Sequence, residues 1–191
     1  MDKIRCGWSE SDPLYRAYHD LEWGVPVFND QLLFEFLILE TFQAGLSWII
    51  VLRKRENFKE AFDNFDYRKI AAYDFRKVKK LLTNPSIIRN RKKIIATIEN
   101  AKAFIKVQNE EGSFANYIWG FVSGIQIVNY YKDLDKIPPY TSLAQRICED
   151  LKDKGFKFLG PTIIYSYMQA IGLVNDHLVS CFRHSEINLK R

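Results

Sequence analysis

The chain has 191 residues, a formal net charge of +5 and a hydrophobic content of 47%, which is enough to build a core and excludes a disordered chain. No apolar run reaches the roughly 18 residues that cross a bilayer, because Glu35 and Glu40 interrupt the longest one. The first residues also lack the apolar core of a signal peptide, so we expect a cytoplasmic protein that has no membrane partner.

Helical patterns that begin with polar capping residues follow one another through the first half of the chain. The expected helices span residues 13–22, 30–44, 47–56, 57–63, 66–72 and 74–82. The second carries Leu33, Phe36 and Leu37 on an apolar stripe that ends at Glu40. A buried carboxylate needs hydrogen-bond donors or an opposite charge. Glu40 therefore either pairs with a local Arg or Tyr in the core or meets a polar ligand.

A bend follows this helix and brings together residues of unusual type. Gly45 ends the helix, and Leu46 and Trp48 stand at the turn before the next apolar segment. A carboxylate, a glycine bend, a protruding Leu and a Trp together can grip a flat ligand with polar edges. The alternative is a plain helix–turn–helix core.

The segment from residue 75 to residue 98 is strongly basic and has no acidic residue. Its eight basic residues are Arg76, Lys77, Lys79, Lys80, Arg89, Arg91, Lys92 and Lys93. Such a segment is either a solvated face or a surface that contacts a nucleic acid, and the pI of about 9.0 favours a polyanionic partner only weakly.

The second half of the chain is also predicted to be helical. Expected helices span 89–110, 114–122, 142–154, 161–171 and 175–182, with a loop over 125–139 that ends at two prolines. No segment has the pattern of a strand. We therefore predict an all-α protein of about ten helices.

Two pairs of residues at opposite ends of the chain have the chemistry of a metal site. His177 and Cys181 are four residues apart, which places them on one face of a helix. Cys6 and His19 can supply the other two ligands of a tetrahedral zinc ion. The alternative is buried cysteines and an ordinary surface His. With Cys148, the three cysteines are too few for a disulfide framework.

A glycine-flanked hairpin, Gly155 to Gly160, joins two predicted helices. Glycines allow close approach to a phosphate, and the helix that begins at Pro161 and Thr162 offers free N–H groups to an anion. Lys157 adds positive charge. The unit is similar to a helix-hairpin-helix, which holds DNA by its backbone, although an ordinary helix–helix turn has the same pattern.

Several motifs in collinear order resemble the bacterial 3-methyladenine DNA glycosylase I family. They are Cys6-Gly-Trp8, Leu14-Tyr-Arg-Ala-Tyr-His19-Asp-Leu-Glu-Trp-Gly24, Glu40-Thr-Phe-Gln-Ala-Gly-Leu-Ser-Trp48, Gly155-Phe-Lys-Phe-Leu-Gly160 and Gly172-Leu-Val-Asn-Asp-His177. The resemblance covers residues 4 to 182. It implies a helix-hairpin-helix glycosylase fold, with one lobe of residues 27–140 and another of 1–26 and 141–184, and a base pocket between them.

The resemblance also implies the roles of particular residues. A structural zinc ion is expected on Cys6, His19, His177 and Cys181. Glu40 and Tyr18 are expected at the catalytic centre, and the base is expected to lie among Trp8, Tyr18, Trp23, Glu40 and Trp48. The DNA is expected to be held by Gly45, Leu46, Gly155, Lys157, Gly160 and Thr162. Asn175 stands where related glycosylases carry an Asp, and His184 has no assigned role.

The activity that this resemblance implies is hydrolysis of the N-glycosidic bond of 3-methyladenine in double-stranded alkylated DNA. The enzyme is expected to act as a monomer in base-excision repair and to release free 3-methyladenine, leaving an abasic site. Glu40 is expected to select the cationic base, and Leu46 to fill the gap in the stack. Two alternatives are a zinc-stapled module that binds DNA without catalysis and a helical scaffold for another protein.

Overall fold

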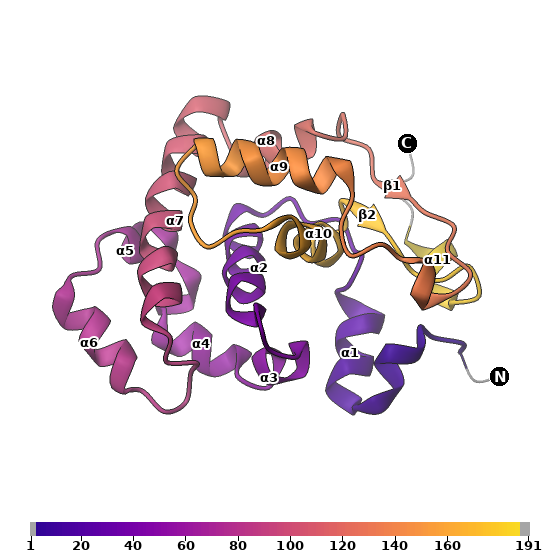
Figure 1. Ribbon diagram of the computed structural model, residues 1–191, viewed down its shortest axis with the longest axis horizontal. Coiled ribbons are helices and arrows are strands. Elements are labelled where there is room, and N and C mark those ends of the chain that lie inside the picture. Colours follow the sequence, from indigo (N-terminus) through magenta and orange to yellow (C-terminus); the bar gives the residue numbers. More distant parts are fainter. Residues whose placement is uncertain (1–2, 188–191) are drawn as a thin grey trace.

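The structure, a computed structural model, describes residues 3–187 and is mostly helical (Figure 1). Its α-helices are α1 Pro13–Leu21, α2 Asp30–Gln43, α3 Trp48–Leu52, α4 Arg55–Ala61, α5 Tyr67–Ala71, α6 Phe75–Thr83, α7 Arg91–Glu111, α8 Phe114–Gly120, α9 Ser142–Asp153, α10 Pro161–Ala170 and α11 Phe182–Glu186. Three 3-10 helices are η1 Gly7–Ser11, η2 Asp63–Phe65 and η3 Leu134–Lys136. No helix within residues 3–187 is long and apolar enough to cross a membrane.

Most helices begin where the sequence predicts, because a polar side chain accepts a hydrogen bond from the first turn. These caps are Asp12, Asn29, Asp66, Asp74, Asn90, Ser113 and Thr141. The predicted helix over 47–56 is wrong in extent, since the chain turns at Arg53 and Lys54 and forms α3 and α4 separately. Local caps therefore determine where most of the helices begin.

Helix α2 lies at the centre of the molecule. Every residue from Leu33 to Phe42 is buried, because α10, α7 and α8 all pack against α2. Figure 1 shows α2 and α10 surrounded by the other helices. The sequence predicts an apolar stripe on one side of this helix, whereas α2 is buried on all sides, and Glu40 is buried with it. The division into two lobes, of residues 27–140 and of residues 1–26 with 141–184, remains a prediction.

Two short strands correct the prediction that no segment of this mostly helical chain forms a strand. β1 Ile127–Val128 pairs in parallel with β2 Val174–Asn175, and flanking bonds join Ile127 N–H to the Leu173 carbonyl and Asn129 N–H to the Asn175 carbonyl, both at 3.0 Å. The helix predicted over 175–182 is therefore wrong. β1, nearly fifty residues earlier in the chain, supplies hydrogen-bond partners to the backbone of β2, and a turn follows before α11.

Candidate active site and metal centre

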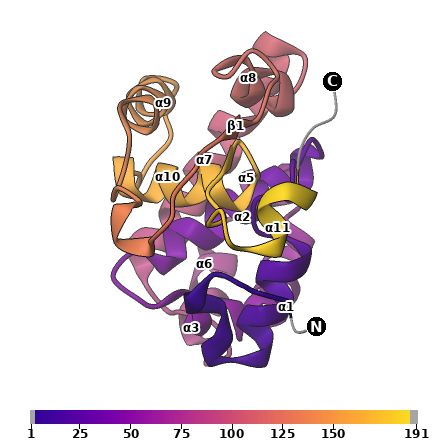
Figure 2. The same cartoon turned by 90° about the vertical axis from the view of Figure 1, so that its right-hand side faces the viewer.

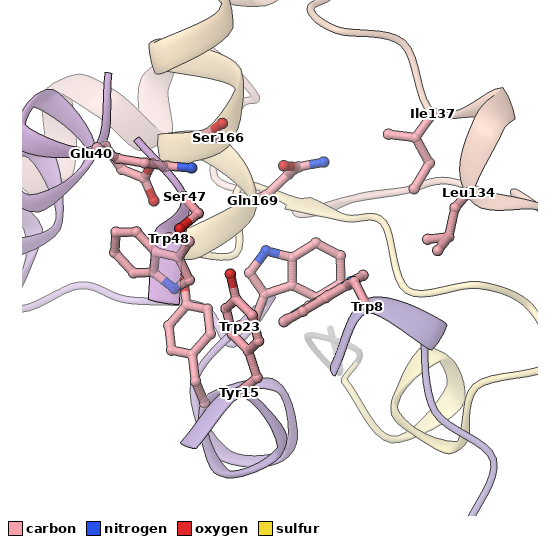
Figure 3. A pocket seen from close by; sticks show the side chains of 12 residues that line it. Trp8, Tyr15, Trp23, Glu40, Ser47, Trp48, Leu134, Ile137, Ser166 and Gln169 are labelled. Carbon is pink, nitrogen blue, oxygen red and sulfur yellow. The ribbon is translucent and has the colours of Figure 1, made fainter. Parts of the chain in front are cut away.

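A cavity of about 480 Å³ opens between α1, the end of α2, α3, α10 and η3 (Figure 3). Its lining is Trp8, Tyr15, Tyr18, Trp23, Glu40, Gln43, Ser47, Trp48, Leu134, Ile137, Ser166 and Gln169. All the residues predicted to surround the base line this one cavity. Elements far apart in the chain thus form a pocket with aromatic walls and few polar groups, which is typical of a small-molecule site.

Glu40 is the buried acid of this pocket. Within the described part of the chain, no donor lies within hydrogen-bonding distance of its Oε2 atom. Burial raises the pKa of Glu40 to about 8. The Arg55 guanidinium bonds Glu35 and Glu22 at 2.6 Å each, and burial is the cause of the shift at Glu40. The predicted pairing of Glu40 with a local Arg or Tyr is therefore absent from residues 3–187, and Oε2 is available to a ligand.

The aromatic side chains form two walls. Trp8 and Trp23 meet edge to face with centroids 5.1 Å apart, and Tyr18 lies 5.4 Å from Trp48. The indole N–H of Trp48 is buried without an acceptor among residues 3–187. Burial, followed by the charge of Glu40, raises the pKa of Tyr18 well above its usual value, so its hydroxyl stays protonated. The walls present ring faces and a few unpaired polar atoms to a ligand.

The four predicted metal ligands converge at one point behind these walls. One donor atom from each of Cys6, His19, His177 and Cys181 lies within 4.8 Å of the others, and all four residues are buried. Cys181 Sγ is 3.4 Å from His19 Nε2 and 3.5 Å from His177 Nδ1. A tetrahedral ion with bonds of about 2.0 to 2.3 Å separates its ligands by about 3.3 to 3.8 Å. The group therefore has the spacing and chemistry to hold a metal ion.

The surroundings of the group orient both imidazoles. His19 Nδ1 lies 2.8 Å from the Asp20 carboxylate, and His177 Nε2 lies 3.0 Å from the Trp23 carbonyl oxygen, which leaves the opposite nitrogen of each ring facing the sulfurs. The Cys6 thiol, together with the two imidazoles, hydrogen-bonds Cys181 and holds the pKa of Cys181 well below that of an ordinary thiol. A thiolate and oriented imidazoles are what a metal ion requires.

The metal group connects the two ends of the chain to the pocket. His177 and Cys181 lie on the turn between β2 and α11, not on one face of a helix as the spacing predicts. Figure 2 shows α11 beside α1, and the Phe182 N–H donates to the Ile4 carbonyl. Trp23 packs on His177 with ring centroids 4.6 Å apart. The group thus lies directly behind a wall of the pocket.

The bend after α2 is held from α7. Gly45 has φ +79° with open space around it, and Leu46 keeps 39% of its surface exposed. Lys93 donates hydrogen bonds to the Phe42 and Ala44 carbonyl oxygens at 2.8 and 2.7 Å. Lys93 is buried, so this residue fits neither of the two alternatives predicted for the 75–98 segment, a solvated face or a surface that contacts a nucleic acid.

The connection between α9 and α10 is likewise fixed from α7. Buried Asn100 accepts from the Lys157 N–H at 2.7 Å and donates to the Lys157 carbonyl at 3.2 Å. Phe156 and Leu159 point inward, whereas the Lys157 side chain is exposed. Gly155 has φ +101°, and Gly160, Pro161 and exposed Thr162 open α10. The loop thus offers exposed backbone and charge on a rigid support.

Known proteins share this sequence pattern and this fold. A family model described as methyladenine glycosylase matches residues 8–184. The chain belongs to this family. Over 177 residues it is 49% identical to DNA-3-methyladenine glycosylase 1 of Escherichia coli strain K12, which covers 93% of this chain and 95% of that protein. It is 44% identical to DNA-3-methyladenine glycosylase of Haemophilus influenzae, over 93% and 96% of the two chains.

Solved structures of the family agree closely with this fold. A crystal structure of 3-methyladenine DNA glycosylase I has a TM-score of 0.91 and 50% identity, covering 94% of this chain and 98% of that one. A variant of 3-methyladenine DNA glycosylase I in complex with 3-methyladenine has a TM-score of 0.90 and 35% identity, covering 93% and 96%.

The sequence predictions missed several members of the pocket. Tyr15 is one; its hydroxyl accepts a hydrogen bond of 2.9 Å from the Ile49 N–H and joins α1 to α3. Leu134 and Ile137 come from η3 and its C-terminal end, inside a segment predicted only as loop. Ser166 and Gln169 could have been predicted as pocket residues, because they are polar residues three apart on the apolar helix α10.

Asn175 and His184 lie outside the pocket. The Asn175 side-chain amide donates to the His184 and Ile187 carbonyl oxygens at 3.1 and 3.0 Å, and its oxygen accepts from the His177 N–H at 3.2 Å. His184 lies 2.8 Å from the Asn129 carbonyl oxygen through Nε2. Both side chains hold the C-terminal segment, and Asn175 is fully buried there.

Proposed function

We propose that this chain hydrolyses the N-glycosidic bond of 3-methyladenine in alkylated DNA, releasing the base and leaving an abasic site. The observation that carries the proposal is Glu40, a buried carboxyl with a free oxygen inside an aromatic pocket. Family membership over residues 8–184 supports the same activity. The enzyme acts in base-excision repair, and we expect it to work as a monomer in the cytoplasm.

The pocket suits a cationic purine. Methylation at N3 gives the base a positive charge and weakens its bond to the sugar, so excision needs no strong general acid. The rings of Trp8, Tyr18, Trp23 and Trp48 favour a cation over a neutral base. An incoming positive charge returns Glu40 to its ionised form, because an opposite charge lowers the pKa of a carboxyl. Glu40 then accepts hydrogen bonds from the adenine edge and discriminates against guanine.

DNA binding is assigned to the exposed bend and loop described above. Leu46, presented by the Gly45 turn, fills the gap that the flipped nucleotide leaves in the stack. The α9–α10 connection acts as a helix-hairpin-helix, in which backbone amides from Gly155 to Thr162 and the Lys157 ammonium hold phosphates. Exposed basic residues of α6 and α7 add electrostatic attraction to the phosphates, which does not depend on the DNA sequence.

The ion in the Cys6, His19, His177 and Cys181 group is proposed to be zinc, because two sulfurs and two imidazole nitrogens form a typical set of structural ligands. Zinc here supplies folding energy and no reaction step. Its ligands fix the segment that carries Trp8 and Trp23 against the C-terminal turn.

The test is incubation of the protein with methylated duplex DNA, followed by chromatographic identification of the released base. The parent is expected to release 3-methyladenine. Glu40→Ala is expected to keep its affinity for the DNA but lose most excision, and Glu40→Gln tests the carboxyl at nearly constant volume. DNA binding without base release by the parent would favour the alternative of a binding module, and equal excision by Glu40→Ala would remove Glu40 from its role.

A further inference from the structure

The α10 wall of the pocket carries an amide whose direction is fixed by a second residue. Gln169 lines the cavity, and its Nε2 donates a hydrogen bond of 2.7 Å to Asp176 Oδ2. Figure 3 shows the Gln169 amide between Ser166 and the Trp8 side of the pocket, with its oxygen on the Ser166 side. Within residues 3–187, no donor bonds that oxygen. Gln169 thus directs an unpaired acceptor into the site.

Asp176 determines which atom of the amide faces the pocket. Its carboxylate is buried and also accepts bonds of 2.6 Å from the Tyr165 hydroxyl and from the Asn129 amide. The bond to Asp176 raises the pKa of Tyr165, after burial itself, and so keeps that hydroxyl a donor. Within residues 3–187, the side-chain partners of this carboxylate are all donors: the Tyr165 hydroxyl and the Asn129 and Gln169 amides. The Gln169 nitrogen must therefore face Asp176, and the Gln169 oxygen must face the cavity.

Asn175 cannot present an unpaired acceptor to the pocket. Both ends of its side-chain amide are bonded to the C-terminal segment, and it does not line the cavity. The acid of the pocket, Glu40, lies on α2 at the base-binding end, among the residues that we assign to recognition. Gln169 lies on α10, a different helix that packs against α2. The pocket therefore holds two acceptors on different helices, Glu40 on α2 and Gln169 on α10, and the second is available for another group.

We propose that Gln169 Oε1 binds and orients the water molecule that attacks C1′. The inference rests on the proposed excision of 3-methyladenine. The C1′–N9 bond breaks with its electron pair passing to the cationic base, which leaves neutral. The water oxygen then forms a bond to C1′ of the oxocarbenium-like sugar, and its surplus proton passes to solvent. An amide oxygen suffices, because this water adds to a sugar that is already electron-deficient and needs orientation more than deprotonation.

The experiment compares Gln169→Met, which removes the acceptor at similar volume, with Gln169→Asn, which keeps an amide but withdraws it by one methylene. Gln31→Met is the matched control, since Gln31 lies at the far end of α2 and its side-chain amide donates to the Asn64 carbonyl there. Each protein is assayed for single-turnover release of 3-methyladenine, for affinity for the free base, and for affinity for duplex DNA with a stable abasic-site analogue.

We expect both Gln169 variants to slow single-turnover release by about 10²-fold, the effect of a misplaced reactant, while both affinities stay within about twofold of the parent. If the Met variant fails to fold, the Asn variant still measures the effect of Gln169 on the rate of release. Release at the parent rate would overturn the inference and leave the proposed function intact. A loss of affinity for the free base as large as the loss of rate would make Gln169 a base-binding residue instead. A parent that releases no 3-methyladenine would overturn both.

Discussion

Lys93 donates a hydrogen bond of 2.7 Å to the carbonyl oxygen of Ala44, directly before the Gly45 bend. A second bond of 2.8 Å reaches the Phe42 carbonyl. The last carbonyls of a helix have no partners within it, and a cation at this end also meets the negative pole of the helix dipole. Lys93 therefore closes α2 and fixes the bend that exposes Leu46. Burial lowers its pKa, but these carbonyl oxygens accept from its ammonium.

Replacing Lys93 by Met should lower the free energy of unfolding by about 2 kcal/mol, because two buried carbonyl oxygens lose a charged donor. The slope of DNA affinity against salt should not change, since Lys93 contacts no phosphate. Lys92→Met is the matched control on the exposed face of α7. It should leave stability within about 0.5 kcal/mol and reduce the salt slope by about one. Denaturant titration and binding at several salt concentrations check both, and the reverse pattern would contradict the assignment.

The four-residue metal group can be tested with Cys148, the third cysteine of the chain, as a control. Cys181→Ser should remove most bound zinc and lower the melting temperature, because a structural site contributes folding energy directly. Some excision should survive, since no step of the reaction uses the ion. Cys148→Ser should keep the metal, because Cys148 is buried in α9 outside the group. Elemental analysis and thermal unfolding are the measurements, and a parent protein without zinc would end the proposal.

The features that could be predicted from the sequence are those set by nearby residues. Caps such as Asp74 and Thr141 act within one turn, so the starts of α6 and α9 could be predicted from a few letters. The pocket residues Glu40 and Trp48 belong to one contiguous motif, and the family resemblance connected that motif with the aromatic N-terminus.

What could not be predicted depends on pairing across long distances in the chain. The segment after Gly172 has an acceptable helical pattern, yet β1 pairs with it and makes it a strand and a turn. The orientation of Gln169 requires Asp176, which no spacing rule connects with it. The basic character of Lys93 indicated a phosphate contact, and only the packing of α7 against α2 shows that it closes a helix.

Leu46 should matter for duplex DNA and much less for a single strand. Leu46→Ala removes the side chain that fills the gap in the stack, so excision from methylated duplex should fall by about tenfold or more, which corresponds to about 1.4 kcal/mol of lost flipping energy. Excision from a methylated single strand should change little. Leu21→Ala, at a side chain that is 73% exposed on α1, is the matched control. Equal losses on both substrates would show that Leu46 supports the pocket and does not act as a wedge.

The raised pKa of Glu40 predicts a specific dependence of stability on pH. In the free protein, Glu40 holds its proton up to about pH 8, whereas the unfolded chain loses it near 4.5. Folding therefore takes up a proton between these values, and the free energy of unfolding should fall as pH rises through this window and level off above pH 8. The loss is at most about 5 kcal/mol, because one pKa unit corresponds to about 1.4 kcal/mol.

Glu40→Gln should remove this slope, because a neutral amide has no proton to lose on unfolding. The variant should consequently be more stable than the parent at pH 8 and close to it at pH 5. Glu56→Gln is the control, since the Glu56 side chain is 83% exposed on α4 and its replacement should leave the slope intact. Denaturant titrations between pH 5 and pH 9 measure all three proteins. A parent whose stability is flat across this range, or a Glu40→Gln slope equal to that of the parent, would mean that Glu40 is already ionised in the free pocket.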